Sequence, residues 1–463
     1  MHIYTLTKLA TDTLCRALRE NPRAGSPTLC RLLSGVNRST LARGLSVLGP
    51  QVVSRGAARR ARYALRRALR GSEASLPLYR IDAAGRGHEV GQLDLIYPVG
   101  SALAFTETFP WPLAGDMRDG WFDGLPYPLV DMRPQGFLGR NFAHRHALDL
   151  AVSGNPDEWS DDDIAHVLAT LGQDQPGNLI LGVGSYRRFL ENRRMGDERF
   201  LTDARVASAY PKFAAAALAH GVVGSSAGGE FPKFTASRAL DGAKVDVIVK
   251  FSGADDSAAV RRWADLLVCE HLALEAIGRE LKVPAAQSAI RRYAGRTFLE
   301  VVRFDRHGEF GRSAVCTLGS LSAALLGSAA ASWPRVAQML FDAGWLSAAD
   351  VSRIALVWWF GRLIGNTDMH EGNLAFRPGL ALAPAYDMLP MMYAPLRGGE
   401  LPHRRYTPAL PLPDEVRVWQ QAAPAAAGYW HTCSQDTRIS RDFRQVCAEN
   451  ARVLNSAWRS FCY

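Results

Sequence analysis

The residues best suited to chemistry lie in two polar segments of the C-terminal half of the chain. The first, residues 358–376 (WWFGRLIGNTDMHEGNLAF), starts as an apolar helix and then presents Asp368, His370 and Asn373 in a loop. The second, LAPAYDMLP, places Asp387 in an extended segment 14 residues after Asn373. In phosphoryl transfer a carboxylate accepts the proton of the attacking hydroxyl, while amide and carboxylate oxygens hold Mg²⁺. Asp368 could therefore be the base and Asn373 with Asp387 the metal ligands; the alternative is that each caps a turn.

Two earlier segments could bind the phosphates of a nucleotide. Residues 221–234 (GVVGSSAGGEFPKF) are rich in glycine, which lets backbone N–H groups turn toward phosphate oxygens, although a surface turn has the same composition. The strand KVDVIVKFS carries Lys250 near its end, where the ammonium could reach the phosphates. Glu270, in a helix expected over residues 260–280, could pair with Lys250; a surface ion pair is the alternative. The order of the four segments favours phosphoryl transfer over four unrelated turns.

The residues around these segments predict a scaffold of mixed helix and sheet. Alternating apolar and polar residues over 76–109 predict a small antiparallel β unit, while residues 111–139 show no regular period. Helices follow, and one of them starts with an acidic turn at Ser160. We predict an α+β fold with a β-rich lobe over residues 73–304, a helical lobe over residues 305–463, and the nucleotide between the two lobes.

The first 72 residues are strongly basic. They hold 14 Lys and Arg against two acids, a net charge of +12, whereas the whole chain carries +9. The basic charge is therefore concentrated in this head. Apolar spacing predicts three helices, the third capped by Asn37 or Ser39, followed by short strands over residues 51–55 and 62–66.

Three helices and an arginine-tipped hairpin are typical of a winged helix-turn-helix domain, which we expect at residues 1–72. In that fold the third helix enters the major groove of DNA while the hairpin contacts phosphates beside it. The alternative is a protein-docking module whose arginines are merely solvated. The side chains that we expect to contact DNA are Arg38, Ser39, Thr40, Arg43, Arg59, Arg60 and Arg62.

Several other classes of protein are disfavoured. The seven cysteines are an odd number, widely spaced and without a C-x-x-C pair, which argues against a disulfide framework or a structural zinc site. Lys8, Asp12 and Arg16 interrupt the N-terminal stretch where a signal peptide would need an apolar run. No segment reaches the roughly 18 apolar residues of a membrane span. We therefore expect a soluble, cytoplasmic protein.

From about Tyr79 onward the sequence resembles the HipA family of bacterial serine/threonine kinases, the toxin kinases of toxin–antitoxin systems. The resemblance rests on SSAGGEFPKF, VIVKF, VVRFDR, GNTDMHEGN and LAPAYDMLP. It is closest to the YjjJ subgroup, in which a helix-turn-helix is fused in front of the kinase body. In other members the DNA-binding function sits on a separate antitoxin. The resemblance thus implies a bilobal HipA-like kinase fold behind the basic head.

The resemblance also implies roles for individual residues, with ATP and Mg²⁺ as cofactors. Asp368 matches the catalytic base, and Asn373 with Asp387 match the metal ligands. Ser226, seven residues before Lys233, matches a serine whose autophosphorylation ejects the Gly-rich loop and switches the kinase off; the adjacent Ser225 is the alternative. The implied ATP-binding residues are Gly228, Gly229, Lys233, Lys250, Val302, Arg303, Phe304, His370, Tyr386 and Asp387.

Two positions depart from the family pattern. Gly372 stands where the family commonly has Lys or Arg, which removes a positive charge close to the transferring phosphoryl group. Val302 replaces a glutamate in the segment that the family places beside the adenine, the hinge of Val302, Arg303 and Phe304, where we expect little effect because hinge contacts to adenine are largely main-chain.

The leading hypothesis is an ATP- and Mg²⁺-dependent serine/threonine kinase that phosphorylates a cellular protein and restrains growth. The resemblance makes an aminoacyl-tRNA synthetase a candidate substrate, and the head would bind DNA for autoregulation. The alternative is a DNA-binding transcriptional regulator whose kinase-like body binds nucleotide with little or no catalysis, and Gly372 is its best support. A separate antitoxin and a homodimer are further candidate partners.

Overall fold

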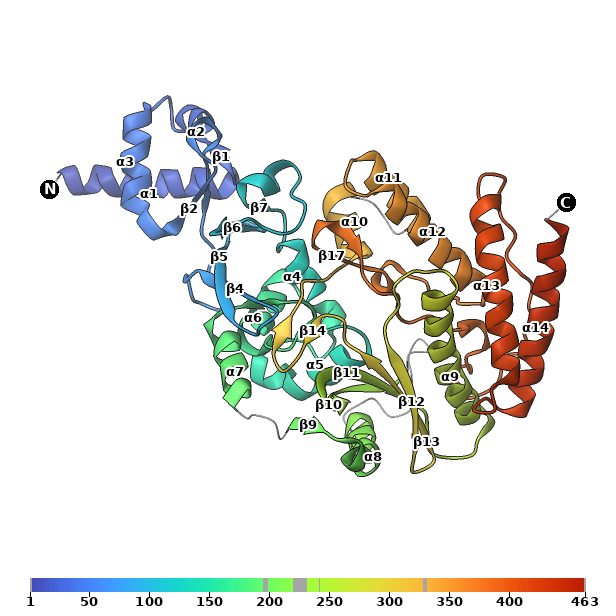
Figure 1. Ribbon diagram of the computed structural model, residues 1–463. Helices are drawn as coiled ribbons and strands as arrows, with labels where there is room; N and C mark the ends of the chain where they lie inside the picture. The colour runs from blue at the N-terminus through green and yellow to red at the C-terminus, as the bar shows by residue number, and fades with distance from the viewer. Residues whose placement is uncertain (1, 195–198, 220–230, 241, 328–330, 462–463) are drawn as a thin grey trace.

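The computed structural model describes residues 2–194, 199–219, 231–240, 242–327 and 331–461 of the chain. Figure 1 shows a small N-terminal head in blue, a central region with two sheets, and a C-terminal group of helices in orange and red. None of the described helices is both long enough and apolar enough to cross a membrane. The six cysteines within the described ranges are all unbridged.

The head contains the predicted helices and hairpin. Asn37 caps α3, because its side chain accepts a hydrogen bond from the Thr40 N–H at 2.9 Å. Leucines from all three helices form a small core of their own, including the buried Leu29 and Leu41. The strands form an antiparallel sheet in the order β1-β3-β2. The elements are α1 (His2–Glu20), β1 (Ala24–Gly25), α2 (Ser26–Leu32), α3 (Arg38–Leu48), β2 (Val52–Arg55) and β3 (Arg62–Leu65).

The next region is built on a five-stranded sheet in the order β7-β6-β5-β4-β8, covered by helices. The predicted antiparallel unit is confirmed, since β4, β5 and β6 pair in succession. Helix α6 starts at the predicted acidic turn, where Ser160 and Asp163 form a capping box. The elements are β4 (Leu76–Ile81), β5 (Gly87–Leu95), β6 (Ser101–Phe105), the 3₁₀ turn η3 (Gly115–Asp119), β7 (Trp121–Phe122), α4 (Tyr127–Asp131), α5 (Gly136–Leu150), α6 (Asp161–Leu171), β8 (Leu179–Leu181) and α7 (Val183–Arg194).

A second five-stranded sheet, in the order β12-β13-β11-β10-β9, follows. Alternation along β11 places Val247 and Val249 in a core with helix α8, and Lys250 on the opposite face. Helix α9 lies on that opposite face. The elements are β9 (Phe200–Leu201), α8 (Asp203–Ala219), β10 (Lys233–Leu240), β11 (Ala243–Phe251), α9 (Ala258–Arg279), β12 (Ser288–Tyr293) and β13 (Arg296–Val302). Residues 73–304 therefore hold helices α4 to α9 as well as both sheets, more helix than a β-rich lobe implies.

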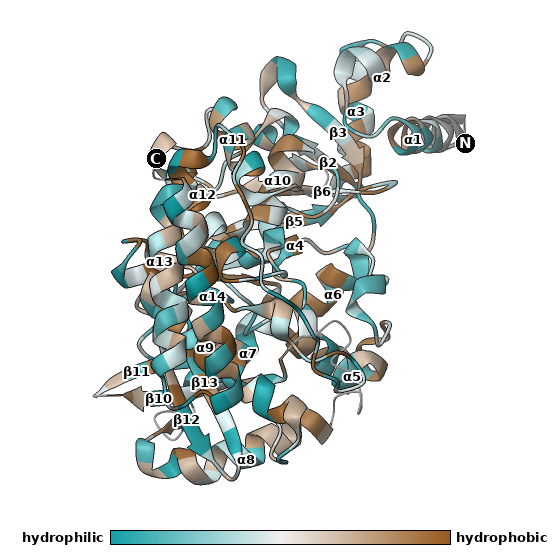
Figure 2. Ribbon diagram, turned by 90° about the vertical axis from the view of Figure 1, so that its right-hand side faces the viewer, coloured by the Kyte–Doolittle hydropathy of each residue, from teal (hydrophilic) through white to brown (hydrophobic). Residues whose placement is uncertain are grey.

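The C-terminal region is mainly helical, as predicted, and packs around the largest apolar core of the described chain. Figure 2 shows hydrophilic and hydrophobic residues mixed along α13 and α14, as expected for helices with one buried face. A small sheet in the order β16-β17-β18 flanks the loop after α12. The elements are β14 (Arg306–His307), β15 (Gly311–Arg312), β16 (Cys316–Thr317), α10 (Leu318–Leu326), α11 (Trp333–Asp342), α12 (Ala348–Leu363), β17 (Ala375–Arg377), β18 (Ala381–Leu382), α13 (Val416–Gln435) and α14 (Arg441–Ser460).

Candidate active site and the basic head

The lysine strand and the second acidic segment meet at one buried ammonium group. Lys250 Nζ lies 2.7 Å and 2.8 Å from the two carboxylate oxygens of Glu270 on α9, and it also pairs with Asp387. The exposed fractions of Lys250 and Glu270 are 6% and 1%. The predicted pairing of Lys250 with Glu270 is present, and it is buried rather than a surface ion pair. Asp387 joins it from 137 residues away in the chain.

The electrostatics of this triad favour the charged forms of Lys250 and Asp387, whereas burial raises the pKa of Glu270 to about 7 despite the nearby Lys250. Burial alone would lower the pKa of Lys250, but Asp387 and Glu270 outweigh burial and raise it. Burial alone would raise the pKa of Asp387, but Lys250 and Lys233 lower it to about 2. Asp387 is therefore an ionised carboxylate at neutral pH, as a metal ligand must be.

The loop after α12 is held in shape by two asparagines. The Asn366 side-chain oxygen Oδ1 accepts a hydrogen bond from the Asp368 N–H at 3.0 Å, and its side-chain Nδ2 donates to the Asp387 main-chain carbonyl at 3.3 Å. The Asn373 amide donates to the Asp368 main-chain carbonyl at 2.9 Å. These bonds join Asp368, Asn373 and Asp387 in one hydrogen-bonded unit, while the Asp368 side chain is exposed. The sequence did not mark Asn366 as functional, because its bridging role depends on a contact with Asp387 from the second segment.

The ligand oxygens of this unit fit Mg²⁺. Asp387 uses one carboxylate oxygen for Lys250, and its other oxygen and the Asn373 side-chain oxygen have no hydrogen-bond partner among the described residues. Carboxylate and amide oxygens are hard ligands of the kind that Mg²⁺ prefers, and Mg²⁺ usually takes only one or two protein groups besides phosphates and water. Within the described ranges, no group of three or more His, Cys, Asp or Glu is placed to hold a metal. The donor set therefore suits a metal shared with phosphates.

Three other residues of the predicted nucleotide site lie together beside the loop. His370 Nδ1 accepts from the Gly372 N–H at 3.1 Å, and the Tyr386 hydroxyl donates to the Gly372 carbonyl at 2.7 Å. A Cβ atom on Gly372 would lie 2.9 Å from the His370 ring. The glycine that departs from the family pattern thus has a local reason, because a side chain there would displace His370. The ring of Phe304 lies 5.8 Å from that of Tyr386.

The other two hinge residues are less available than we expected. The Val302 N–H donates to the Gln287 carbonyl at 2.8 Å, and the Arg303 N–H donates to the Asp246 carbonyl at 2.9 Å. The Arg303 guanidinium forms two 3.1 Å hydrogen bonds with Asp305. Both N–H groups therefore bond within the protein, and the Arg303 side chain bonds to Asp305.

The remaining predicted ATP-binding residues lie at or before the start of β10. Lys233 is the first residue of β10 and stands opposite Lys250 across the two strands. Its charge contributes to the low pKa of Asp387. The predicted residues Ser225, Ser226, Gly228 and Gly229 lie outside the described residues.

One side of the hairpin of the head contacts the rest of the chain, while its tip is exposed. The pairs Arg60–Asp119 at 3.5 Å and Arg62–Asp116 at 2.8 Å join the hairpin to η3. Altogether seven head arginines form what we call the seam, a row of ion pairs with six aspartates of residues 94–163. The seam consists of Arg23–Asp123, Arg55–Asp94, Arg66–Asp94, Arg60–Asp119, Arg62–Asp116, Arg67–Asp162 and Arg70–Asp163.

Half of the basic charge of the head is therefore used within the chain. Among the residues predicted to contact DNA, Arg60 and Arg62 belong to the seam. Arg59 is exposed at the hairpin tip. The predicted residues on α3 are also exposed, with Arg43 donating only to Thr40 at 3.4 Å and Ser39 to Asn37 at 2.7 Å; they are Arg38, Ser39, Thr40 and Arg43.

Comparison with known proteins places the chain in a family. A family model described as "YjjJ-like toxin, middle domain" matches residues 72–190, and one described as "HipA-like C-terminal domain" matches residues 225–458. The Escherichia coli (strain K12) protein Toxin YjjJ is 35% identical over 436 residues, covering 93% of this chain and 95% of its own. The chain belongs to the YjjJ-like toxin family.

Solved structures give this YjjJ-like chain its fold. HipA of Shewanella oneidensis MR-1, from the complex of HipA, HipB and operator DNA, matches 83% of this chain and 97% of its own with a TM-score of 0.54 and 16% identity. The YjjJ-like chain therefore shares the HipA kinase fold. The Helicobacter pylori proinflammatory kinase CtkA matches 50% of this chain and 95% of its own at 10% identity and a TM-score of 0.34, too weakly to argue from.

The family model at residues 72–190 covers the surface on which the head docks. All six seam aspartates lie within that match. In this YjjJ-like chain the middle domain therefore supplies the aspartates that pair with the basic head, a role that was not predicted from the sequence. An excess of acids over residues 94–163 was the available signal.

Proposed function

We propose that the chain is an ATP- and Mg²⁺-dependent serine/threonine protein kinase of the HipA type, a toxin that restrains growth by phosphorylating a cellular protein. The observation that carries this proposal is the buried triad of Lys250, Glu270 and Asp387. A lysine on a strand, paired with a glutamate of the following helix and a carboxylate suited to Mg²⁺, is the arrangement that protein kinases use to place the phosphates of ATP. A structural ion pair would not need the left-handed backbone of Asp387, whose φ is +58°.

Each residue of the candidate active site has its own role in the proposed reaction. Lys250, fixed by Glu270, orients the phosphates, and Asn373 with the free oxygen of Asp387 would hold Mg²⁺. When bound, Mg²⁺ supplies positive charge to the phosphate oxygens. Asp368 accepts the proton of a serine or threonine hydroxyl as that oxygen takes the phosphoryl group and ADP leaves. The exposure of Asp368 supports a substrate as large as a protein, because a folded chain can reach it.

We further propose that the kinase phosphorylates its own Gly-rich loop at Ser226 or Ser225 and switches itself off in this way. A phosphoserine carries about −1.5 to −2 charges, which a loop folded around other phosphates would repel. The candidate cellular substrate is an aminoacyl-tRNA synthetase, and such a substrate implies a cytoplasmic location. The family resemblance supports both.

Labelling with ATP tests the proposal. Purified full chain is incubated with γ-labelled ATP and Mg²⁺, and label is expected on the Gly-rich loop of the wild type and none on Asp368→Ala. Asp414→Ala is the matched control, because Asp414 is an exposed loop aspartate of the same helical region. Equal labelling of wild type and Asp368→Ala would refute the catalytic assignment. Induction of the two chains in cells gives the second readout: growth arrest by the wild type alone separates a kinase from a passive nucleotide-binding regulator.

A second proposed function, DNA binding by the head, is favoured by the exposed face of α3. Arg38 and Arg43 project from the helix that would enter a major groove, as in a winged helix-turn-helix domain. The HipA of Shewanella oneidensis was solved with HipB and operator DNA, which supports DNA and an antitoxin as partners here. Because Arg60 and Arg62 belong to the seam, we propose that α3 and Arg59 carry the contacts.

A gel shift on the upstream promoter region tests this second function. Replacing Arg38 and Arg43 with alanine should weaken binding and reduce the salt slope by about two, since each phosphate contact contributes about one. Arg60→Ala should leave affinity and slope close to those of the wild type. The reverse pattern would show that the hairpin, and not α3, faces the DNA.

A further inference from the structure

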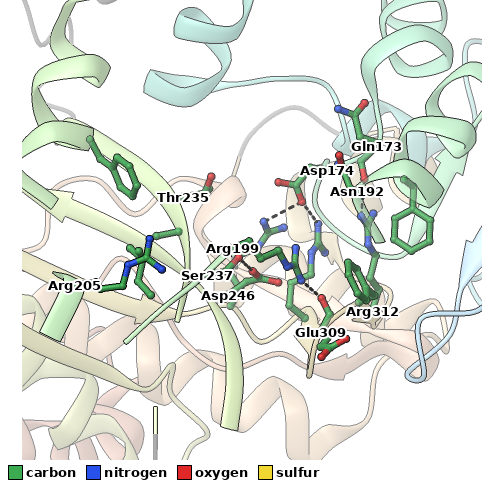
Figure 3. Close-up of a pocket in the computed structure, with 17 residues that line it drawn as sticks. Gln173, Asp174, Asn192, Arg199, Arg205, Thr235, Ser237, Asp246, Glu309 and Arg312 are labelled. Carbon is green, nitrogen blue, oxygen red and sulfur yellow. Dashed lines mark hydrogen bonds and ion pairs between the residues drawn. The ribbon is translucent and has the colours of Figure 1, made fainter. Parts of the chain in front are cut away.

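A second cavity lies apart from the triad, where the middle domain meets the edge of the second sheet. Figure 3 shows it between the loop of Gln173 and Asp174, strand β10 and the hairpin that carries Arg312. Its volume is about 450 Å³, within the range of small-molecule sites. None of Lys250, Asp368, Asn373 and Asp387 lines it. Arg303 is the one residue that it shares with the predicted nucleotide site.

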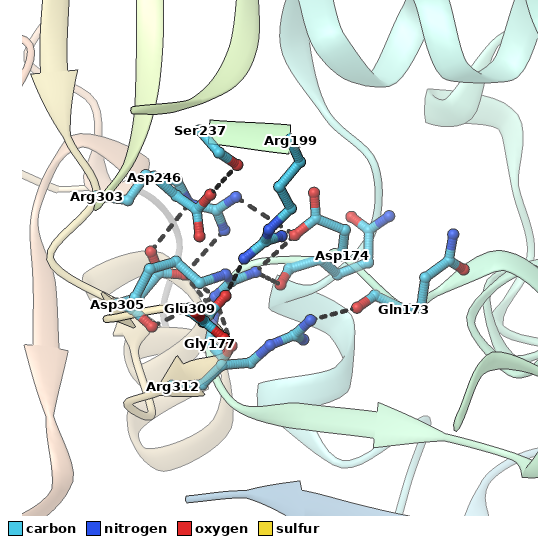
Figure 4. A network of polar contacts seen from close by, with 12 residues as sticks. Gln173, Asp174, Gly177, Arg199, Ser237, Asp246, Arg303, Asp305, Glu309 and Arg312 are labelled. Carbon is cyan, nitrogen blue, oxygen red and sulfur yellow. Dashed lines mark hydrogen bonds and ion pairs between the residues drawn. The ribbon is translucent and has the colours of Figure 1, made fainter. Parts of the chain in front are cut away.

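The cavity has more positive than negative charge. Five arginines and three acidic residues line it. Two of the arginines, Arg303 and Arg306, are neutralised by aspartates. Arg303 pairs with Asp305 (Figure 4). Arg306 lies 2.6 Å from Asp305 and 3.1 Å from Asp174. The other three, Arg199, Arg205 and Arg312, have no carboxylate within ion-pair distance among the described residues. An anion entering the cavity would therefore meet uncompensated positive charge.

Arg312 is the strongest indication that an anionic ligand belongs there. Its exposed fraction is 6%, and its Nη2 donates to the Gln173 main-chain carbonyl at 2.5 Å. Its Nη1 is buried without a hydrogen-bond partner among the described residues, and so is Arg199 Nε. Burial and the nearby Arg306 lower the pKa of Arg312 to about 9. A buried guanidinium without a counter-ion is costly, and a bound anion would remove that cost.

The remaining wall of the cavity is aromatic. Phe189, Phe213 and Phe310 line it. The guanidinium of Arg312 lies 4.9 Å from the centre of the Phe189 ring, and that of Arg199 lies 4.4 Å from the centre of the Phe310 ring. Flat apolar walls beside unpaired arginines suit a ligand that has both a ring and a phosphate.

We propose that this cavity is a second ligand site, which binds a phosphate-bearing molecule of nucleotide size. Arg312, Arg199 and Arg205 receive the phosphate, and the phenylalanines contact the ring. The site is separate from the proposed kinase cleft and does not depend on catalysis. Because it borders the hinge through Arg303, a molecule bound there contacts both the middle domain and the second sheet.

Calorimetric titration of the full chain with ADP and with inorganic pyrophosphate, both in EDTA, tests the proposal. Removing Mg²⁺ disfavours the proposed metal-dependent cleft, so the cavity should dominate. ADP is expected to bind more tightly than pyrophosphate, because only ADP has a ring. Arg205→Gln should weaken binding of both probes by about tenfold, the usual contribution of one charged hydrogen bond. Arg188→Gln is the control, since Arg188 is an exposed arginine of the neighbouring α7 that does not line the cavity.

Two further variants make the outcome decisive. Arg312→Met should abolish binding while the melting temperature stays the same or rises, because a buried charge without a counter-ion is removed. Lys250→Met should leave the binding event intact. The proposal would be overturned if neither probe binds. It would also be overturned if Lys250→Met loses binding while Arg205→Gln and Arg312→Met retain it. Equal affinity for ADP and pyrophosphate would overturn the assignment of a ring-bearing ligand. No arm measures phosphoryl transfer, so failure of the kinase proposal would leave these results unchanged.

Discussion

The seam contains one buried aspartate whose removal should loosen the head far more than that of any other. Asp94 is 4% exposed, forms ion pairs with Arg55 and Arg66, each at 2.6 Å, and accepts a hydrogen bond from the Ser75 hydroxyl at 2.5 Å. The side chains of Arg55 and Arg66 are themselves only 16% and 14% exposed. Asp94→Asn would leave two largely buried cations facing a neutral amide. Breaking a buried ion pair by removing one partner costs about 3 to 5 kcal/mol.

Hydrogen exchange of the backbone amides in residues 1–72 measures this loss. Since each 1.4 kcal/mol is a factor of ten, 3 kcal/mol corresponds to opening that is more than about a hundredfold more frequent. Asp123→Ala is the matched control in the same seam: Asp123 pairs with Arg23 at 2.6 Å, but its side chain is 99% exposed. A surface pair contributes about 0 to 1 kcal/mol. The effect of Asp123→Ala should therefore be at most about fivefold, and 1 M salt should cancel it.

Equal acceleration in Asp94→Asn and Asp123→Ala would refute this reasoning. It would mean that burial does not decide the strength of the seam. Protection unchanged in both variants would mean that the head is held by its apolar contacts alone. Exchange that accelerates across the whole chain, rather than within residues 1–72, would show that Asp94 supports the middle domain and not the docking.

Three further outcomes are expected at the candidate active site. Asn366→Ala should slow labelling by ATP about thirtyfold or more, because two hydrogen bonds that position Asp368 and Asp387 are lost; an unchanged rate in the same labelling assay would contradict the bridging role. The free energy of unfolding should fall by about 2 kcal/mol as the pH drops from about 4 to 2, because the pKa of Asp387 is about 2 in the folded chain and 3.8 in the unfolded chain. Urea unfolding measures this loss, and Asp387→Asn should not show it. Gly372→Ala should weaken ATP binding severalfold by displacing the neighbouring histidine, which calorimetry measures against the wild type; equal affinity would show that the loop absorbs the methyl group.

Local features of the fold could be predicted from the sequence. Asn37 as the cap of α3, the acidic start of α6 at Ser160 and the strands of 76–109 depend on residues that are neighbours in the chain. The pairing of Lys250 with Glu270 is of the same kind, because a strand followed by a helix brings the two together.

Long-range pairs could not be predicted. Nothing in the sequence says that Asp94 meets both Arg55 and Arg66, so DNA and solvent were the expected surroundings of the positive charge of the head. Likewise the family resemblance placed Arg303 beside the adenine, whereas its side chain bonds to Asp305 and lines the second cavity. In both cases the partner of a charge decided its role, and tertiary contacts choose the partner.

The seam has a practical consequence for anyone who studies the head by itself. A fragment of residues 1–72 would carry its full net charge of +12 with seven arginines freed from their aspartates. Such a fragment would adhere to any polyanion, heparin and RNA included, through side chains that the whole protein keeps covered. Its affinity for DNA would overstate that of the intact chain, and its selectivity would understate it.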